Sequence, residues 1–233
     1  MIQLLFHYGL GERQIGECFK GACIGNHIEV AKCIWNQYPD CCQSNLQSAF
    51  LRCGRGSLEL LQWLWDLGLD MRDEWSCNLP YWDACEAGHL PQAKWLWSLQ
   101  KEDKDDNVAL RKTLKYGRLD VASWILWECI EYEPGYFWVE CDLLFAWRDA
   151  CCTGRLEIVQ WVESTGIIDK WDELEEAWSG ACARGHLSVI RHLLLHHRIP
   201  KTLIAEALEI SRPSVVDEIV MTRNSRKKKS ARK

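Results

Sequence analysis

The chain has 233 residues, of which 48% are hydrophobic, and its 28 Lys and Arg against 33 Asp and Glu give a net charge of −5. This content of apolar side chains is enough for a buried core, which excludes a chain that is disordered throughout. No apolar run approaches the roughly 18 residues of a membrane-spanning helix, so the sequence predicts no membrane span.

The predicted elements follow one internal repeat, and in chain order each repeat is a short helix, a tight turn and a second helix. Six turn residues mark the repeats: Asn26, Gly56, Gly88, Gly117, Gly154 and Gly185. Their spacings are 30, 32, 29, 37 and 31 residues. Gly and Asn suit such a turn because they tolerate the left-handed backbone conformation. Positions within a repeat are counted from the turn residue, so that +1 is the residue after it.

Each repeat carries small or apolar side chains at fixed positions of its two helices. Position −3 is Cys in five repeats and Leu in one: Cys23, Cys53, Cys85, Leu114, Cys151 and Cys182. Positions +7 and +8 are mostly Trp followed by an aliphatic residue, as in Trp161-Val162, and we expect both to pack in the core. Helices this short are not stable alone, so neighbouring repeats must bury each other's apolar faces. The pattern therefore predicts an all-α solenoid.

Incomplete repeats are expected at both ends of the array. The segment 2–8 superposes on 190–196, which predicts an N-terminal half-repeat that consists of a second helix. The segment 203–221 predicts a degenerate helix pair that acts as a C-terminal cap, with Pro213 in the first turn of its second helix. We therefore divide the chain into a repeat array, residues 1–222, and a basic tail, residues 223–233, which we expect to be disordered.

The repeat pattern resembles the ankyrin repeat. The residues that carry the resemblance are Ala-Cys-x-x-Gly-His-Leu-x-x-x-x-Trp-Leu, as at 84–96, where the family has Ala-Ala-x-x-Gly-His-x-Glu-Val-Val-x-Leu-Leu. The Trp variant is similar to divergent ankyrin arrays of large DNA viruses and of microbes that live with protist hosts. The family's Thr-Pro-Leu-His is missing, and only the segment 78–82 keeps a Pro at that place. We therefore expect irregular loops between the helix pairs.

The resemblance implies an ankyrin-type solenoid of about six repeats that binds proteins without catalysis, such as an adaptor that binds host proteins. No serine-hydrolase Gly-x-Ser-x-Gly, phosphate-binding Gly-x-x-x-x-Gly-Lys or dinucleotide-binding Gly-x-Gly-x-x-Gly motif is present. The sequence therefore predicts no enzyme, no small-molecule substrate and no cofactor.

Charge is unevenly distributed along the chain. Residues 223–233 hold seven Lys and Arg and no acid, which leaves 21 positive against 33 negative charges, a net of −12, on residues 1–222. Such an acidic array disfavours nucleic acid and favours a protein partner with a basic patch. The run Arg226, Lys227, Lys228 and Lys229 is a candidate nuclear import signal or anion-binding arm. A nuclear or nucleic-acid-associated function through this tail therefore stays open as the alternative.

The longest gap between turns contains an insertion at residues 128–140, which mixes aromatic and acidic side chains. Insertions in solenoids often lie on the binding face, and Tyr and Trp are enriched at binding hot spots. The candidate binding residues are Glu131, Tyr132, Tyr136, Phe137 and Trp138. The alternative is that these aromatic side chains pack between neighbouring repeats. The polar segment 101–106 is expected to be a solvated loop.

Cysteine and histidine also raise the question of metal binding. Cys and His recur four residues apart in Cys23/His27, Cys85/His89 and Cys182/His186, but two ligands per repeat do not make a closed zinc site, so we assign these pairs to packing.

A second group is His192, His196 and His197, in which the first two share a helix face. No acid-bearing motif accompanies them, so we assign them to a helix C-terminus, whose dipole they complement. The sequence thus predicts no metal site.

The 13 cysteines are an odd number, which excludes complete internal pairing and favours a reduced, cytoplasmic setting. Cys41-Cys42 is expected in a loop after Tyr38-Pro39-Asp40, and no Cys-x-x-Cys redox motif is present.

Overall fold

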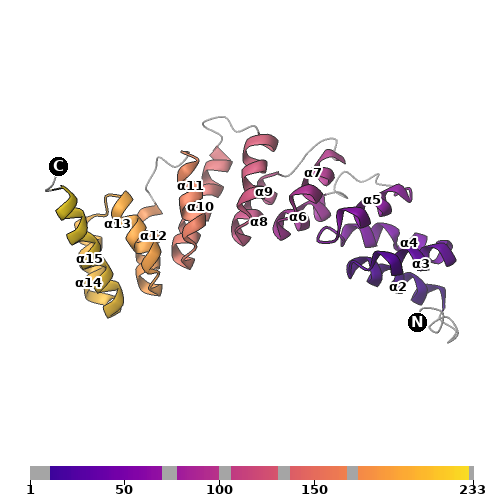
Figure 1. The fold of residues 1–233 in the computed structure, drawn as a ribbon, viewed down its shortest axis with the longest axis horizontal. Coiled ribbons are helices and arrows are strands. Elements are labelled where there is room, and N and C mark those ends of the chain that lie inside the picture. The colour runs from indigo at the N-terminus through magenta and orange to yellow at the C-terminus, as the bar shows by residue number, and fades with distance from the viewer. Residues whose placement is uncertain (1–10, 70–77, 100–105, 131–136, 167–172, 231–233) are drawn as a thin grey trace. The chain divides into compact units, whose positions relative to one another are not determined.

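The computed structural model describes residues 11–69, 78–99, 106–130, 137–166 and 173–230. Every regular element in these ranges is a helix and none is a strand, which confirms the all-α class (Figure 1). The predicted half-repeat at 2–8 lies outside the described residues. The chain divides into two compact halves, residues 1–131 and 132–233, and the boundary falls within the insertion at residues 128–140.

The helices form pairs that correspond to the predicted repeats. The N-terminal half contains α2 (Glu12–Ile24), α3 (Ile28–Gln37), α4 (Pro39–Leu51), α5 (Leu58–Asp66), α6 (Asn78–Ala87), α7 (Leu90–Leu99), α8 (Asp106–Tyr116) and α9 (Leu119–Trp124), which the π-helical turn η2 (Ile125–Cys129) continues. The C-terminal half contains α10 (Phe137–Thr153), α11 (Leu156–Ser164), α12 (Leu174–Arg184), α13 (Leu187–His196), α14 (Lys201–Ile210) and α15 (Pro213–Ser230).

Successive pairs stack within each half. First helices pack on first helices, as α2 does on α4, α6 on α8 and α10 on α12. Second helices pack on second helices, as α7 does on α9 and α11 on α13. Each pair thereby buries its apolar face against the next pair, as helices of this length require.

The predicted turn residues adopt the expected backbone conformation in five of the six repeats. Their φ angles are positive: 56° at Asn26, 83° at Gly88, 70° at Gly117, 80° at Gly154 and 79° at Gly185. Gly56 is the exception, because α4 ends at Leu51 and a longer irregular connection leads to α5. Five of the six turn positions predicted from the sequence are therefore confirmed.

The core follows two of the predicted positions closely and a third only in part. All six residues at position −3 are buried, and so are all six at +8. At +7, Trp124 is buried with 6% of its surface exposed, but Trp63, Trp95 and Trp161 are only half-buried. The expectation that every +7 Trp lies in the core was therefore wrong.

Two of these half-buried indoles instead form edge-to-face contacts between neighbouring repeats. Trp63 meets Trp35 with ring centroids 6.5 Å apart, and Trp95 meets Trp65 at 6.2 Å. These indoles therefore lie where the second helices of successive repeats meet.

In two repeats, the residue at +1 bonds to the turn region of the repeat before it. Nε of Arg118 donates to the carbonyl oxygen of Glu86 at 3.2 Å, and Nε2 of His186 lies 3.0 Å from the carbonyl oxygen of Cys152. Both acceptors occupy position −2 of the preceding repeat. These bonds satisfy carbonyl groups that a helix end leaves unpaired.

The predicted cap is a helix pair, α14 and α15, and Pro213 is the first residue of α15, as expected. The tail differs from the prediction, because α15 continues to Ser230 and residues 223–230 are helical where the sequence predicts disorder. Lys and Arg are good helix formers, and no Gly or Pro follows Pro213 to end the helix.

The insertion at residues 128–140 is partly helical. Residues 128–129 belong to η2, and residues 137–140 form the first turn of α10, which at 17 residues is longer than the other first helices. Part of the inserted sequence therefore lengthens a helix.

The turn glycine at 154 is predicted to be intolerant of alanine for two separate reasons. Its φ is positive, and a Cβ atom there would lie 2.5 Å from Nδ1 of His186, which is held by its bond to Cys152. We expect Gly154→Ala to lower the free energy of unfolding by about 2–3 kcal/mol in urea titrations. Gly166→Ala is the matched control, since its φ is also positive but the site is open, and it should cost only about 1 kcal/mol. Equal losses in the two variants would contradict the contact with His186.

Candidate functional site

The predicted binding residues are only partly described. Glu131, Tyr132 and Tyr136 lie outside the described residues, and Phe137 begins α10 with its side chain outside the description. Trp138, in the first turn of α10, exposes 68% of its surface. Two turns further along the same helix, Phe145 exposes 51%, and the Arg148 guanidinium carbon lies 5.1 Å from the centre of its ring. Residues seven apart share a helix face, so α10 presents two large aromatic side chains together.

The basic residues of the tail, Arg226, Lys227, Lys228 and Lys229, belong to the last turns of α15. Their side chains fall outside the described part of the chain.

The repeat cysteines have the character of packed, unreactive thiols. Cys23 and Cys182 are buried, and burial raises the pKa of each thiol to about 12. Burial likewise raises the pKa of Cys85 and Cys151. A thiol is reactive as its thiolate, so these side chains are inert at neutral pH.

The pair Cys41-Cys42 lies in the first turn of α4, so its predicted loop position was wrong. Pro39 occupies the first helical position, which is compatible with a helix and accounts for the difference. Cys42 is buried, and burial raises the pKa of its thiol to about 11.

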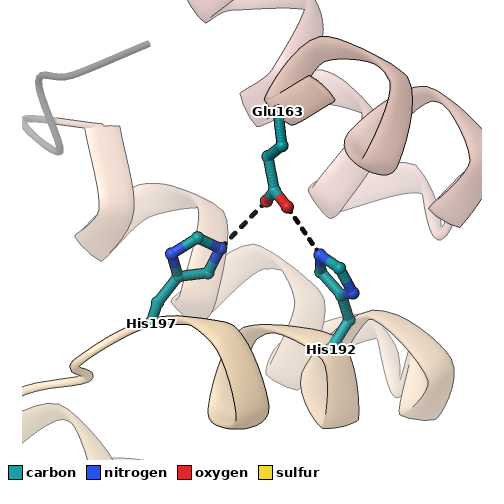
Figure 2. A group of neighbouring side chains, drawn as sticks. All are labelled: Glu163, His192 and His197. Atoms are coloured by element: carbon teal, nitrogen blue, oxygen red, sulfur yellow. Dashed lines mark hydrogen bonds and ion pairs between the residues drawn. The ribbon is translucent and has the colours of Figure 1, made fainter. Parts of the chain in front are cut away.

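The histidines near the end of α13 do have an acidic partner, which the sequence analysis missed. Glu163 of α11 belongs to the preceding repeat, and its carboxylate lies between His192 and His197 (Figure 2). Nε2 of His192 lies 2.7 Å from Oε2, and Nε2 of His197 lies 2.9 Å from Oε1. Each imidazole therefore contacts a different oxygen of one carboxylate.

The helix end explains why these two histidines converge. α13 ends at His196, and His197 has extended backbone angles of φ −118° and ψ 159°. Five residues apart on a continuous helix, His192 and His197 would point in different directions. The change of backbone direction turns the His197 ring back towards α11, while the ring of His196 stacks on that of His192 with centroids 4.5 Å apart. The shared face predicted for 192 and 196 is confirmed, but the pair that meets Glu163 is 192 and 197.

A buried indole holds the same carboxylate. Nε1 of Trp147, on α10, donates to Oε1 of Glu163 at 3.0 Å, and the Trp147 side chain is buried. Burial alone would raise the pKa of Glu163, but the hydrogen bonds from His192, His197 and Trp147 outweigh it and lower the pKa to about 2. The carboxylate is therefore ionised throughout the neutral range.

The N-terminal half has a polar network at corresponding repeat positions. The Tyr81 hydroxyl donates to Oδ1 of Asp106 at 2.7 Å, and Nε1 of Trp97 donates to Oδ2 at 3.3 Å. Tyr81 and Trp147 both occupy position −7, and Trp97 and Glu163 both occupy +9. Asp106, expected in a solvated loop, is instead buried at the start of α8 because these two donors satisfy its carboxylate.

Glu163, His192 and His197 form a donor set of two imidazoles and one carboxylate, and their ligand atoms all lie within 4.8 Å of one another. Among the described residues, no other group of three His, Cys, Asp or Glu converges in this way, and the Cys-x-x-x-His pairs do not. The set can act as a charged hydrogen-bond network between α11 and α13, or it can hold a metal ion.

Comparison with known proteins gives no match to any protein-family model, curated protein or solved structure. None of the helices in the described ranges combines the length and apolar character that a bilayer span requires.

The low pKa of Glu163 gives a prediction about acid stability. A carboxyl whose folded-state pKa lies below its unfolded value stabilises the fold above the unfolded pKa, and this contribution is lost as pH falls towards the folded pKa. From about pH 6 to about pH 3, the stability advantage of the wild type over Glu163→Gln should shrink by about 2 kcal/mol in urea unfolding. Glu157→Gln changes an exposed carboxylate on the same helix and is the control. An advantage that does not vary with pH would refute the assigned interactions.

Proposed function

We propose that the chain is an ankyrin-type helical solenoid that acts as a non-enzymatic protein-interaction module. The stacked helix pairs, the positive-φ turns and the bonds from +1 to the preceding turn support a repeat scaffold built to present a surface. The ankyrin assignment rests on the resemblance of the repeat motif to that family. The variant with Trp resembles the host-binding arrays of large DNA viruses and of microbes that live with protist hosts.

The observation that carries the proposal is the exposed aromatic face of α10. Trp138 and Phe145 share one side of this helix, while the helix packs on α11 and α12. A Trp that is 68% exposed leaves a large apolar area in water, and such side chains are enriched at the centres of protein interfaces. The aromatic face of α10, defined by Trp138 and Phe145, is the proposed contact surface.

Charge indicates the kind of partner. The net charge of −12 on residues 1–222 attracts proteins with a basic patch and speeds their encounter with the array. The aromatic face would then supply the contacts that slow dissociation.

Affinity capture from source cells tests the aromatic face. We expect the double variant Trp138→Ala/Phe145→Ala to lose the partners that the wild type retains, because losing a hot-spot residue costs about 2 kcal/mol or more, which is about 30-fold in affinity. Leu79→Ala, at an exposed apolar residue of α6, should retain them. Comparable thermal unfolding of the three proteins ensures that losses reflect contacts. Full retention by the double variant contradicts the proposed surface.

The basic tail is the basis of the alternative, a nuclear or nucleic-acid-associated function. Its specific support is that α15 remains helical to Ser230, so the run 226–229 has an ordered backbone.

Deleting residues 223–233 separates the two functions. Thr222, the last buried side chain of α15 among those the structure describes, remains, so the fold should persist. We expect partner capture to be unchanged by the deletion. Loss of capture, or nucleic-acid binding that disappears with the deletion, would favour the alternative instead.

A further inference from the structure

We propose that Glu163, His192 and His197 bind a divalent transition-metal ion of the zinc class. The inference is independent of the proposed interaction function, because it rests on contacts of α11 with the end of α13 and with Trp147, none of which belongs to the aromatic face.

The donor atoms are arranged as ligands of one ion. Two imidazole nitrogens approach one carboxylate from two directions, at 2.7 and 2.9 Å, and Figure 2 shows both rings pointing towards it. Zinc bonds of about 2.0–2.2 Å in tetrahedral geometry place neighbouring ligand atoms about 3.3 Å apart. To reach this spacing, each contact between Glu163 and an imidazole must open by about half an ångström, and the two imidazole nitrogens, which lie within 4.8 Å of each other, must come to the same separation.

The surroundings hold the ligands in position. The buried Trp147 donates to Oε1 of Glu163 and fixes the orientation of the carboxylate, as outer hydrogen-bond donors do in zinc sites. Stacking against His196 restrains the ring of His192. The side chains of His192, His197 and Glu163 expose 10%, 8% and 18% of their surface. This burial limits competition from water, while the carboxylate keeps a path to solvent.

The donor set selects the kind of ion. Imidazole nitrogen favours zinc and its neighbours in the transition series over magnesium and calcium, which prefer all-oxygen sites. Two His and one Glu are three ligands, so a bound zinc ion keeps a fourth position for water. The ion would bind the second helices of two successive repeats together, and its binding energy would add to the stability of this half of the chain.

The test uses the full chain, stripped of metal with a chelator and then titrated with zinc chloride. Calorimetry should show one site per chain, and zinc should raise the Tm of the wild type. Glu163→Gln and His197→Gln each remove one ligand while keeping the side chain's size and polarity, and should weaken zinc binding by a factor of about 100 or more. His27→Gln is the matched control, because it changes an exposed histidine outside the site, and should alter the Kd by no more than about twofold.

Cobalt substitution identifies the ligands independently. Co²⁺ in this site should show the visible absorption of nitrogen and oxygen ligation, without the near-ultraviolet charge-transfer band that cysteine ligation produces. This measurement is needed because the chain has 13 cysteines, which also bind zinc. No zinc binding by the wild type, binding that survives unchanged in Glu163→Gln and His197→Gln, or a thiolate band from the bound cobalt would each overturn the proposal.

Discussion

No helix pair in this protein can be stable without its neighbours, and that constraint accounts for most of the structure. Helices of about ten residues recover little free energy from their own hydrogen bonds. The small buried side chains at −3 let first helices approach closely, and the aliphatic side chains at +8 fill the space between second helices. Bulky and polar side chains lie at the edges of these helix contacts. They include the half-buried indoles and the candidate site of Glu163, His192 and His197.

Sequence reasoning predicted the features that recur and missed those that occur once. The turns, the helix pairs and the positions −3 and +8 each leave several copies in the sequence, so coincidence is easily excluded. The meeting of Glu163 with His197 leaves one copy and joins residues 34 positions apart. It also depends on where α13 ends, and a shift of that end by one residue would turn the His197 ring elsewhere. Helical spacing therefore predicts that His192 and His196 lie together, because residues four apart share a face of a continuous helix.

Two polar networks occupy corresponding places in the two halves, and both begin with a buried aromatic donor at position −7. Tyr81 reaches a carboxylate at the start of the next repeat, while Trp147 reaches one in its own repeat. An aromatic side chain with a single polar atom suits this position, because it fills the core and still satisfies a buried acceptor. Burying a carboxylate here is tolerable only with such donors, so the −7 residue and its acid depend on each other.

The contact between His186 and Gly154 also limits how such an array can change over time. The space that a side chain would need at one turn is already filled by the residue that follows the next turn. A repeat copied or exchanged by recombination carries its own turn glycine but meets a new neighbour. The segment that can be exchanged without loss of this contact is therefore not one helix pair. It runs from a turn glycine to the side chain that packs on it, as from Gly154 to His186. Recombination that keeps this segment intact keeps the contact.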